Sequence, residues 1–232
     1  MRKNIPFFLV GGGFFLGFIL FSYLVHKDIF TQIDFNTTVR LQDAISRRFD
    51  FIFSLFSDIG NFETLTIVLI VILAFLRKIL AGIILFAGFT LFHVIEVFGK
   101  YFVDHPPPPQ FMLRTQDIVE MPQFHVRAEF SYPSGHSGRT IYLSVILLYM
   151  IWRSTRFPKF VRYGLILAVL VFDGVMLISR VYLGEHWLTD VIGGVLLACG
   201  ISIFGLGFIR RTKRVKSKKT ESISKSLFAY RA

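Results

Sequence analysis

Three groups of polar residues in this chain have the types and spacing needed to hold a phosphate. They are Lys100, the stretch PSGH at residues 133–136, and a segment that runs from Ser179 to Asp190. Lysine and arginine bind anionic oxygens, and small residues before a helix leave unpaired backbone N–H groups that favour an anion. The candidate phosphate-binding residues are therefore Lys100, Ser134, Gly135 and Arg180.

Two histidines in the same groups could carry covalent chemistry. His186 and Asp190 are four residues apart, which puts them on one face of a helix. A carboxylate behind an imidazole fixes its tautomer and leaves the far nitrogen free to attack or to shuttle a proton. His136 is a second histidine at the same pocket, and one histidine as nucleophile with the other as general acid would suffice for phosphoryl transfer. No metal and no cofactor is expected, since Lys100 and Arg180 would repel a cation.

Each group taken alone also has a purely structural explanation. PSGH could be a turn with a helix cap. His186 and Asp190 could form a purely structural hydrogen bond, and Arg180 could anchor its helix at the membrane surface. The functional hypothesis therefore depends on whether the fold brings the three groups together.

Composition indicates an integral membrane protein. The 232 residues are 53% hydrophobic, with 28 Phe and a mean hydropathy of +0.60, far more apolar than a soluble domain. The net charge of +11 clusters beside the apolar runs, which favours membrane orientation and lipid contact over nucleic-acid binding. A single domain over residues 1–232 is expected, with a basic cytoplasmic tail at 210–232.

Six apolar runs are candidates for membrane spans, which predicts an all-α, six-transmembrane-helix bundle. Lys and Arg cluster at alternate ends of the runs, so both termini are expected in the cytoplasm of a multi-pass cytoplasmic-membrane protein. All three polar groups then meet on the extracytoplasmic face. The expected spans are 5–25, 60–76, 79–99, 140–152 with part of its polar lead-in, 163–178 and 188–209.

Details of the helices and loops are also predicted. Asn36 is a candidate cap for an amphipathic interfacial helix, and Pro106 to Pro109 favour extended polyproline geometry. Gly13 and Gly17 have a spacing that permits close helix contact. Glu96 and Lys100 are expected to form an ion pair. The intramembrane Asp173 is expected to have a structural partner rather than a catalytic role.

The chain resembles the type 2 phosphatidic acid phosphatase (PAP2) superfamily, which includes vanadium haloperoxidases and acid phosphatases. The family signature is Lys-x6-Arg-Pro, then Pro-Ser-Gly-His, then Ser-Arg-x5-His-x3-Asp. The second part is complete at 133–136 and the third at 179–190, and the resemblance covers about residues 62–208. It implies that His186 is the nucleophile, that Asp190 orients it, and that His136 protonates the leaving oxygen.

The first part of the signature departs from the family pattern. Pro107 stands where the family has arginine, so one phosphate-binding cation is missing. Arg114, His105 and Arg127 lie in the same segment and are candidate substitutes, with Arg114 preferred.

The resulting hypothesis is a membrane phosphatase that hydrolyses a lipid phosphate or diphosphate through a phosphohistidine. Undecaprenyl diphosphate, phosphatidylglycerol phosphate and phosphatidate are the candidate substrates, and the partners are this lipid and the bilayer. A phosphotransferase with the same intermediate, and a catalytically weak lipid-phosphate binder, remain alternatives. The sequence does not indicate an oligomeric state.

Overall fold

The computed structural model describes residues 4–76, 79–115 and 130–209, and this part of the chain folds into helices, as expected. The α-helices are α1 Ile5–His26, α2 Thr31–Ala44, α3 Asp50–Ile59, α4 Phe62–Leu76, α5 Ile79–Phe102, α6 Gly135–Arg153, α7 Lys159–Tyr182 and α8 Leu188–Ile209. Two short 3-10 helices, η2 Arg47–Phe49 and η3 Gln110–Met112, lie in the connections.

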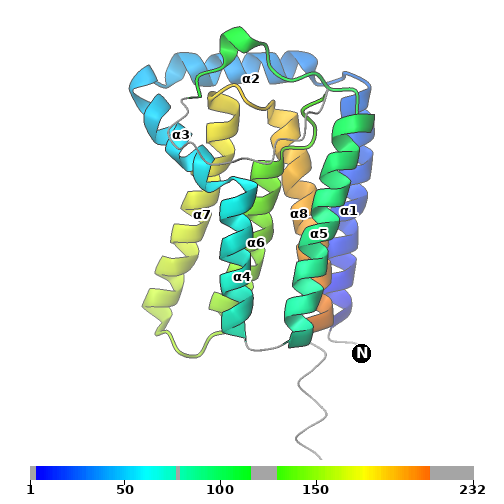
Figure 1. Cartoon of the computed structure of the whole chain (residues 1–232), viewed down its shortest axis with the longest axis vertical. Helices are drawn as coiled ribbons and strands as arrows, with labels where there is room; N and C mark the ends of the chain where they lie inside the picture. Colours follow the sequence, from blue (N-terminus) through cyan, green and yellow to red (C-terminus); the bar gives the residue numbers. More distant parts are fainter. Residues whose placement is uncertain (1–3, 77–78, 116–129, 210–232) are drawn as a thin grey trace, which may run out of the picture.

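The long helices form a bundle that is covered at one end (Figure 1). Helices α1 and α4 to α8 run along the long axis, whereas α2 lies across the end opposite the N-terminus. Helix α2 contacts α7 and α8, and α3 packs against α7. Residues 103–115, which follow α5, pass over the same covered end. This end therefore gathers residues from distant parts of the chain.

Helix α8 lies at the centre of the packing, against α1, α5 and α6. Its contact with α1 depends on glycine. A Cβ on Gly11 would lie 2.7 Å from the backbone N of Phe204, and one on Gly200 would lie 3.0 Å from the backbone N of Phe15. The prediction for Gly13 and Gly17 was wrong, because a Cβ on either would have no neighbour within 4 Å.

The predicted count of six spans is not confirmed. Among the described residues, α1, α5, α7 and α8 are each long and apolar enough to cross a membrane. Residues 47–59 and 62–75 form a bent pair, with an angle of 53°, that would make a fifth span. Helix α4 has 15 residues, short of the roughly 20 that a span needs, and α6 begins with polar residues such as His136 and Arg139.

The outer surface of the bundle is strongly apolar, which fits a lipid environment. Large side chains on several of the upright helices are more than half exposed, including Leu9, Phe75, Ile79 and Phe160. Exposed apolar area on this scale would promote association of a protein in water. The chain is therefore a membrane protein built from spanning helices.

The predicted helix cap at Asn36 was wrong. Helix α2 begins at Thr31, just after a turn in which Asp28 has a φ of 55°. Asn36 lies within the helix, and its side-chain oxygen accepts a hydrogen bond from Gln32 at 2.8 Å. The helix ends where Ile45 becomes extended, so the amphipathic region is divided between α2 and α3.

Candidate active site

The end of α7 turns the chain back so that His186 lies over Arg180. Gly184 has a φ of 69°, a conformation that glycine adopts without steric cost. The backbone carbonyl of Arg180 then accepts hydrogen bonds from the N–H groups of Glu185 and His186, each at 3.2 Å. This local turn explains why five residues separate the arginine from the histidine in the sequence.

Asp190 holds His186 at the start of α8. Its Oδ2 lies 3.3 Å from Nδ1 of His186 and accepts a hydrogen bond at 2.9 Å from the backbone N–H of Trp187. The carboxylate is fully buried, and His186 is 9% exposed. Because Nδ1 faces the carboxylate, Nε2 is the nitrogen left for a reaction.

The start of α6 supplies the second predicted group. Ser134 caps the helix, and its Oγ accepts hydrogen bonds from the backbone N–H of Ser137 at 3.5 Å and from its hydroxyl at 3.0 Å. The backbone N–H of Ser134 donates to the carbonyl of Asp190 at 2.9 Å, which ties α6 to α8. Tyr132 lies two residues before this cap, and its hydroxyl forms a hydrogen bond with Ser22 at 2.8 Å. Burial raises the pKa of this hydroxyl.

Lys100 belongs to a charged cluster on α5 and α6. The expected ion pair forms, with Nζ of Lys100 3.5 Å from Oε1 of Glu96. Oε2 of Glu96 also lies 3.4 Å from Nη1 of the buried Arg139 and 3.1 Å from Nδ1 of His93. A Cβ on Gly135 would lie 1.9 Å from Oε1 of Glu96, so this glycine makes room for the carboxylate.

The guanidinium of Arg180 is fully buried and only partly used. Its Nη2 donates to Oγ of Ser57 at 2.7 Å and lies 2.5 Å from Oε2 of Glu185. Its Nε and Nη1 are buried without a hydrogen-bond partner among the described residues. Buried charged donors carry a large cost when unpaired, so these two nitrogens indicate a place for an anion.

His136 faces the same region from α6. Its Nε2 lies 2.8 Å from Oδ1 of Asn61, at the break between α3 and α4. It is within Coulombic range of Arg180, Arg139, His186 and Lys100. The structure thus brings the three sequence groups together at the covered end of the bundle.

The candidate substitutes for the missing arginine have other partners. The backbone N–H of Arg114 donates to the carbonyl of Leu183 at 2.8 Å. Its guanidinium donates from Nη1 to the hydroxyl of Tyr182 at 3.3 Å and lies 5.2 Å above the same ring. His105 is buried against two carboxylates, which leaves neither ring nitrogen for a phosphate. Arg127 lies outside the described residues, and Pro107 is exposed.

Several residues of this site were missed by sequence reasoning. They are Asp34, Ser57, Asn61, Thr115 and Arg139, which contact the predicted residues or their direct partners. Arg139 lies three residues after His136, so helical spacing could have drawn attention to it. The adjacent Gly60 and Asn61 mark a break between two apolar helices, which was a usable signal as well.

Comparison with known proteins finds a family and related phosphatases. Residues 75–214 match the PAP2 superfamily model, close to the expected range. The chain is 32% identical over 91 residues to phosphatidylglycerophosphatase B of Bacillus subtilis, covering 39% of this chain and 45% of that protein. It is 32% identical over 135 residues to an undecaprenyl-diphosphatase of Sulfolobus acidocaldarius, covering 58% of each. The chain thus spans about half the length of these curated relatives.

Two solved structures share the fold. One is a transmembrane PAP2-type phosphatidylglycerolphosphate phosphatase from Bacillus subtilis, with a TM-score of 0.71 and 20% identity over 89% of this chain and 99% of that one. The other is Aquifex aeolicus LpxE, with a TM-score of 0.53 and 19% identity over 75% of this chain and 94% of that one. Because the family model matches more than half of the sequence, this chain belongs to the PAP2 superfamily.

Proposed function

We propose that this protein is a membrane phosphatase that hydrolyses a lipid phosphate or diphosphate. The observation that carries the proposal is the turn that joins His186 to Arg180. His186 is held by Asp190, its backbone N–H donates to the carbonyl of Arg180, and the buried guanidinium of Arg180 has two nitrogens without a partner among the described residues. A nucleophile beside a buried cation is the arrangement that phosphoryl transfer requires. Membership of the PAP2 superfamily supports the same reaction.

The reaction proceeds in two steps without a metal ion. Nε2 of His186 attacks the terminal phosphorus, so that an N–P bond forms while the P–O bond to the leaving group breaks. The leaving group is the lipid alcohol of a monophosphate or the lipid monophosphate of a diphosphate, and His136 gives a proton to its oxygen. Water then attacks the phosphohistidine, His136 takes its proton, and phosphate is released. Lys100, Ser134, Gly135 and Arg180 hold the phosphoryl oxygens and stabilise their charge in the transition state.

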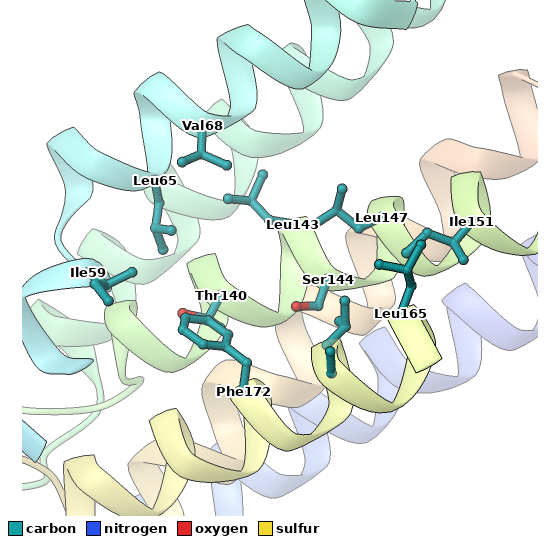
Figure 2. Close-up of a pocket in the computed structure, with 12 residues that line it drawn as sticks. Ile59, Leu65, Val68, Thr140, Leu143, Ser144, Leu147, Ile151, Leu165 and Phe172 are labelled. Atoms are coloured by element: carbon teal, nitrogen blue, oxygen red, sulfur yellow. The ribbon is translucent and has the colours of Figure 1, made fainter. Parts of the chain in front are cut away.

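An apolar cavity below the site supports a substrate with a hydrocarbon chain (Figure 2). It has a volume of about 390 Å³ and lies between α3, α4, α6 and α7, and its lining includes Ile59, Leu65, Leu143 and Phe172. Thr140, one helical turn after His136, also lines it. A headgroup at His186 could therefore keep its tail among these side chains.

The relatives narrow the candidate substrates. One acts on phosphatidylglycerophosphate and another on undecaprenyl diphosphate, as their names state. Phosphatidylglycerol phosphate and undecaprenyl diphosphate are therefore the first substrates to test, with phosphatidate as the third.

The proposed topology has six spans and an extracytoplasmic site. The connection between α6 and α7 carries Arg153, Arg156 and Lys159 and lies at the same end as the N-terminus (Figure 1). Positively charged loops remain in the cytoplasm, which supports cytoplasmic termini in a cytoplasmic membrane. Helices α4 and α6 would complete the six spans.

The test is phosphate release by the purified protein from the three lipids, with His186→Ala beside the wild type. We expect release by the wild type, a loss of at least a thousandfold in the variant, and no effect of EDTA. Equal turnover by both would remove His186 as nucleophile, and loss of activity with EDTA would indicate a metal enzyme. Phosphorylation of an added alcohol would instead identify a phosphotransferase.

A weak lipid-phosphate binder is the second candidate, and two observations favour it. Pro107 stands where the family has a phosphate-binding arginine, and the carboxylate of Glu185 already neutralises part of the charge of Arg180. Saturable binding of a lipid phosphate without release of phosphate would establish this alternative.

A further inference from the structure

His105 is buried between two carboxylates from different helices. Its Nδ1 lies 2.9 Å from Oδ1 of Asp190 in α8, and its Nε2 lies 3.6 Å from Oδ2 of Asp34 in α2. His105 is 6% exposed, Asp34 is 1% exposed, and Asp190 is fully buried. Two buried carboxylates need compensating positive charge, and the imidazole lies where it can supply it.

The imidazole can donate to both carboxylates only when it is protonated on both nitrogens. Burial alone would lower the pKa of His105, but the hydrogen bonds and charges of Asp190 and Asp34 outweigh it and raise the pKa to about 9. In the part of the chain that the structure describes, the other titratable group that faces the ring is Tyr132, whose ring is 6.4 Å away with an edge-to-face orientation. His105 is therefore a cation at neutral pH.

Asp190 is shared between this cation and the proposed nucleophile. Its Oδ1 binds His105, whereas its Oδ2 faces His186 and accepts from Trp187 N–H. Asp34 is fixed in turn by Thr189, whose backbone N–H and hydroxyl donate to it at 2.9 and 2.7 Å. The order of contacts is Asp34, His105, Asp190, His186.

The segment that carries His105 is itself anchored to the site. The carbonyl of His105 accepts hydrogen bonds from the N–H and the hydroxyl of Ser131, at 3.0 and 3.2 Å. The next residue, Pro106, accepts a hydrogen bond at its carbonyl from the indole of Trp187 at 2.8 Å. The backbone at His105 and Pro106 is thus held by Ser131 and Trp187, which fixes the position of the imidazole beside Asp190.

We propose that His105, held by Asp34, is a positioning residue that orients Asp190 and withdraws part of its negative charge from His186. The inference rests on the proposed function, because it assigns His186 as the nucleophile. A carboxylate with no other partner would hold a proton strongly on the imidazole, which would block attack by Nε2. By sharing the charge, His105 leaves Asp190 able to orient His186 and weakens its hold on that proton.

The decisive variant is His105→Asn, because its amide can still donate to Asp190 but carries no charge. We expect the acidic limb of the kcat/KM profile to move to higher pH by roughly one unit, with KM for the lipid little changed. Asp34 affects Asp190 only through His105. Asp34→Asn should therefore move the acidic limb of the kcat/KM profile in the same direction, but by a smaller amount than His105→Asn. Asp43→Asn makes the same charge change at an exposed position of α2 and should leave the profile unchanged.

The outcomes separate this inference from the proposed function. If the wild type releases phosphate and His186→Ala does not, the proposed function stands. Profiles of His105→Asn and Asp34→Asn that then superimpose on the wild type would overturn the role of His105 alone. If neither variant folds, the contacts of His105 serve the structure alone, and the proposed role of His105 would be overturned as well. A wild type without turnover would remove the proposed function itself.

Discussion

Glu185 places a carboxylate on the guanidinium that the proposed reaction needs for phosphate. Its Oε2 lies 2.5 Å from Nη2 of Arg180, and its Oε1 accepts hydrogen bonds from Thr115 at 2.6 Å and Ser57 at 3.4 Å. The carboxylate is thus held by three elements. An incoming phosphate meets a cation that is already partly neutralised, and its own charge is repelled by Glu185.

Glu185→Gln should therefore strengthen the binding of phosphate-like anions. We expect the concentration of orthovanadate that halves the activity to fall roughly tenfold. The amide oxygen can still accept from Arg180, and the amide N–H groups can donate to the hydroxyls of Thr115 and Ser57, but the negative charge is removed. Inhibition curves at constant ionic strength measure this. Asp104→Asn, at an exposed position of the connection between α5 and α6, controls for general electrostatics. Weaker inhibition in Glu185→Gln would mean that Glu185 orients Arg180 instead of competing with phosphate.

Sequence spacing could predict only those parts of the site that are local in the chain. His186 and Asp190 are one helical turn apart, so their pairing follows from the period of the helix. Asn61 is 75 residues from His136, Ser57 is 123 residues from Arg180, and Asp34 is 155 residues from Thr189. Those contacts depend on the packing of α2 and α3 over the bundle end, which no local pattern encodes.

The same limit explains the outcome for the substitutes of the missing arginine. His105 and Arg114 have suitable chemistry and lie in the right segment of the sequence. Their partners, Asp34 and Tyr182, come from other helices and determine where the side chains point. The residue types and their place in the sequence could be predicted, but the direction in which each side chain points could not.

Helices α6 and α8 meet through their backbones, which fixes the two halves of the site relative to each other. A Cβ on Gly194 would lie 2.5 Å from the carbonyl oxygen of Ser134 and 3.2 Å from the N of Gly138. Both neighbours are backbone atoms at the start of α6, so neither can move aside as a flexible side chain would. Ser134, with the N-terminus of α6, is thereby held against the helix that carries Asp190.

Gly194→Ala should separate these helices and damage both stability and activity. We expect a loss of about 1–3 kcal/mol from overpacking, together with reduced kcat because His136 moves relative to His186. Thermal unfolding in detergent and lipid turnover measure the two effects. Gly205→Ala is the matched control on α8, where the nearest neighbour of the added Cβ is 4.0 Å away. It should be neutral or stabilising, since alanine favours helix over glycine. Equal melting temperatures for the two variants would contradict this account.

Helix boundaries were predictable where composition changes sharply. Residues 188–209 were expected as one helix and form α8 with these bounds, because a long apolar run is bounded by polar residues. Helix α7 is longer than expected, since its ends carry Lys159 and Arg180, which a search for apolar runs excludes. The apolar run of the fourth span begins only at residue 140, but part of its polar lead-in was expected to belong to the helix, and α6 does begin at Gly135 with Ser134 as its cap.

Buried charge is concentrated at the covered end of the molecule, whereas the bundle below it is mainly apolar. The buried charged residues of that end include Asp34, Glu96, Arg139, Arg180 and Asp190. Asp173, as expected, has a structural partner within the bundle, accepting a hydrogen bond from Ser144 at 2.6 Å. The covered end is therefore held partly by charge pairs, and its stability should depend on pH.

His105 determines one part of this pH dependence. Its pKa is raised from 6.5 to about 9 in the folded protein, because the pairs with Asp190 and Asp34 outweigh burial. The folded state then binds the proton more tightly than the unfolded state. The stabilisation, on the order of 3 kcal/mol, is fully present below pH 6.5 and is lost as pH rises through about 9.

Thermal unfolding of the detergent-solubilised protein should reveal this loss. We expect the melting temperature of the wild type to fall by several degrees between pH 6.5 and 9.5, and the fall to be smaller in His105→Asn. The difference between the two proteins isolates His105 from lysine and tyrosine groups that titrate at high pH in both. His26→Asn, at an exposed position of α1, should keep the dependence of the wild type. Parallel curves for the wild type and His105→Asn would show that the imidazole is not charged between its two carboxylates.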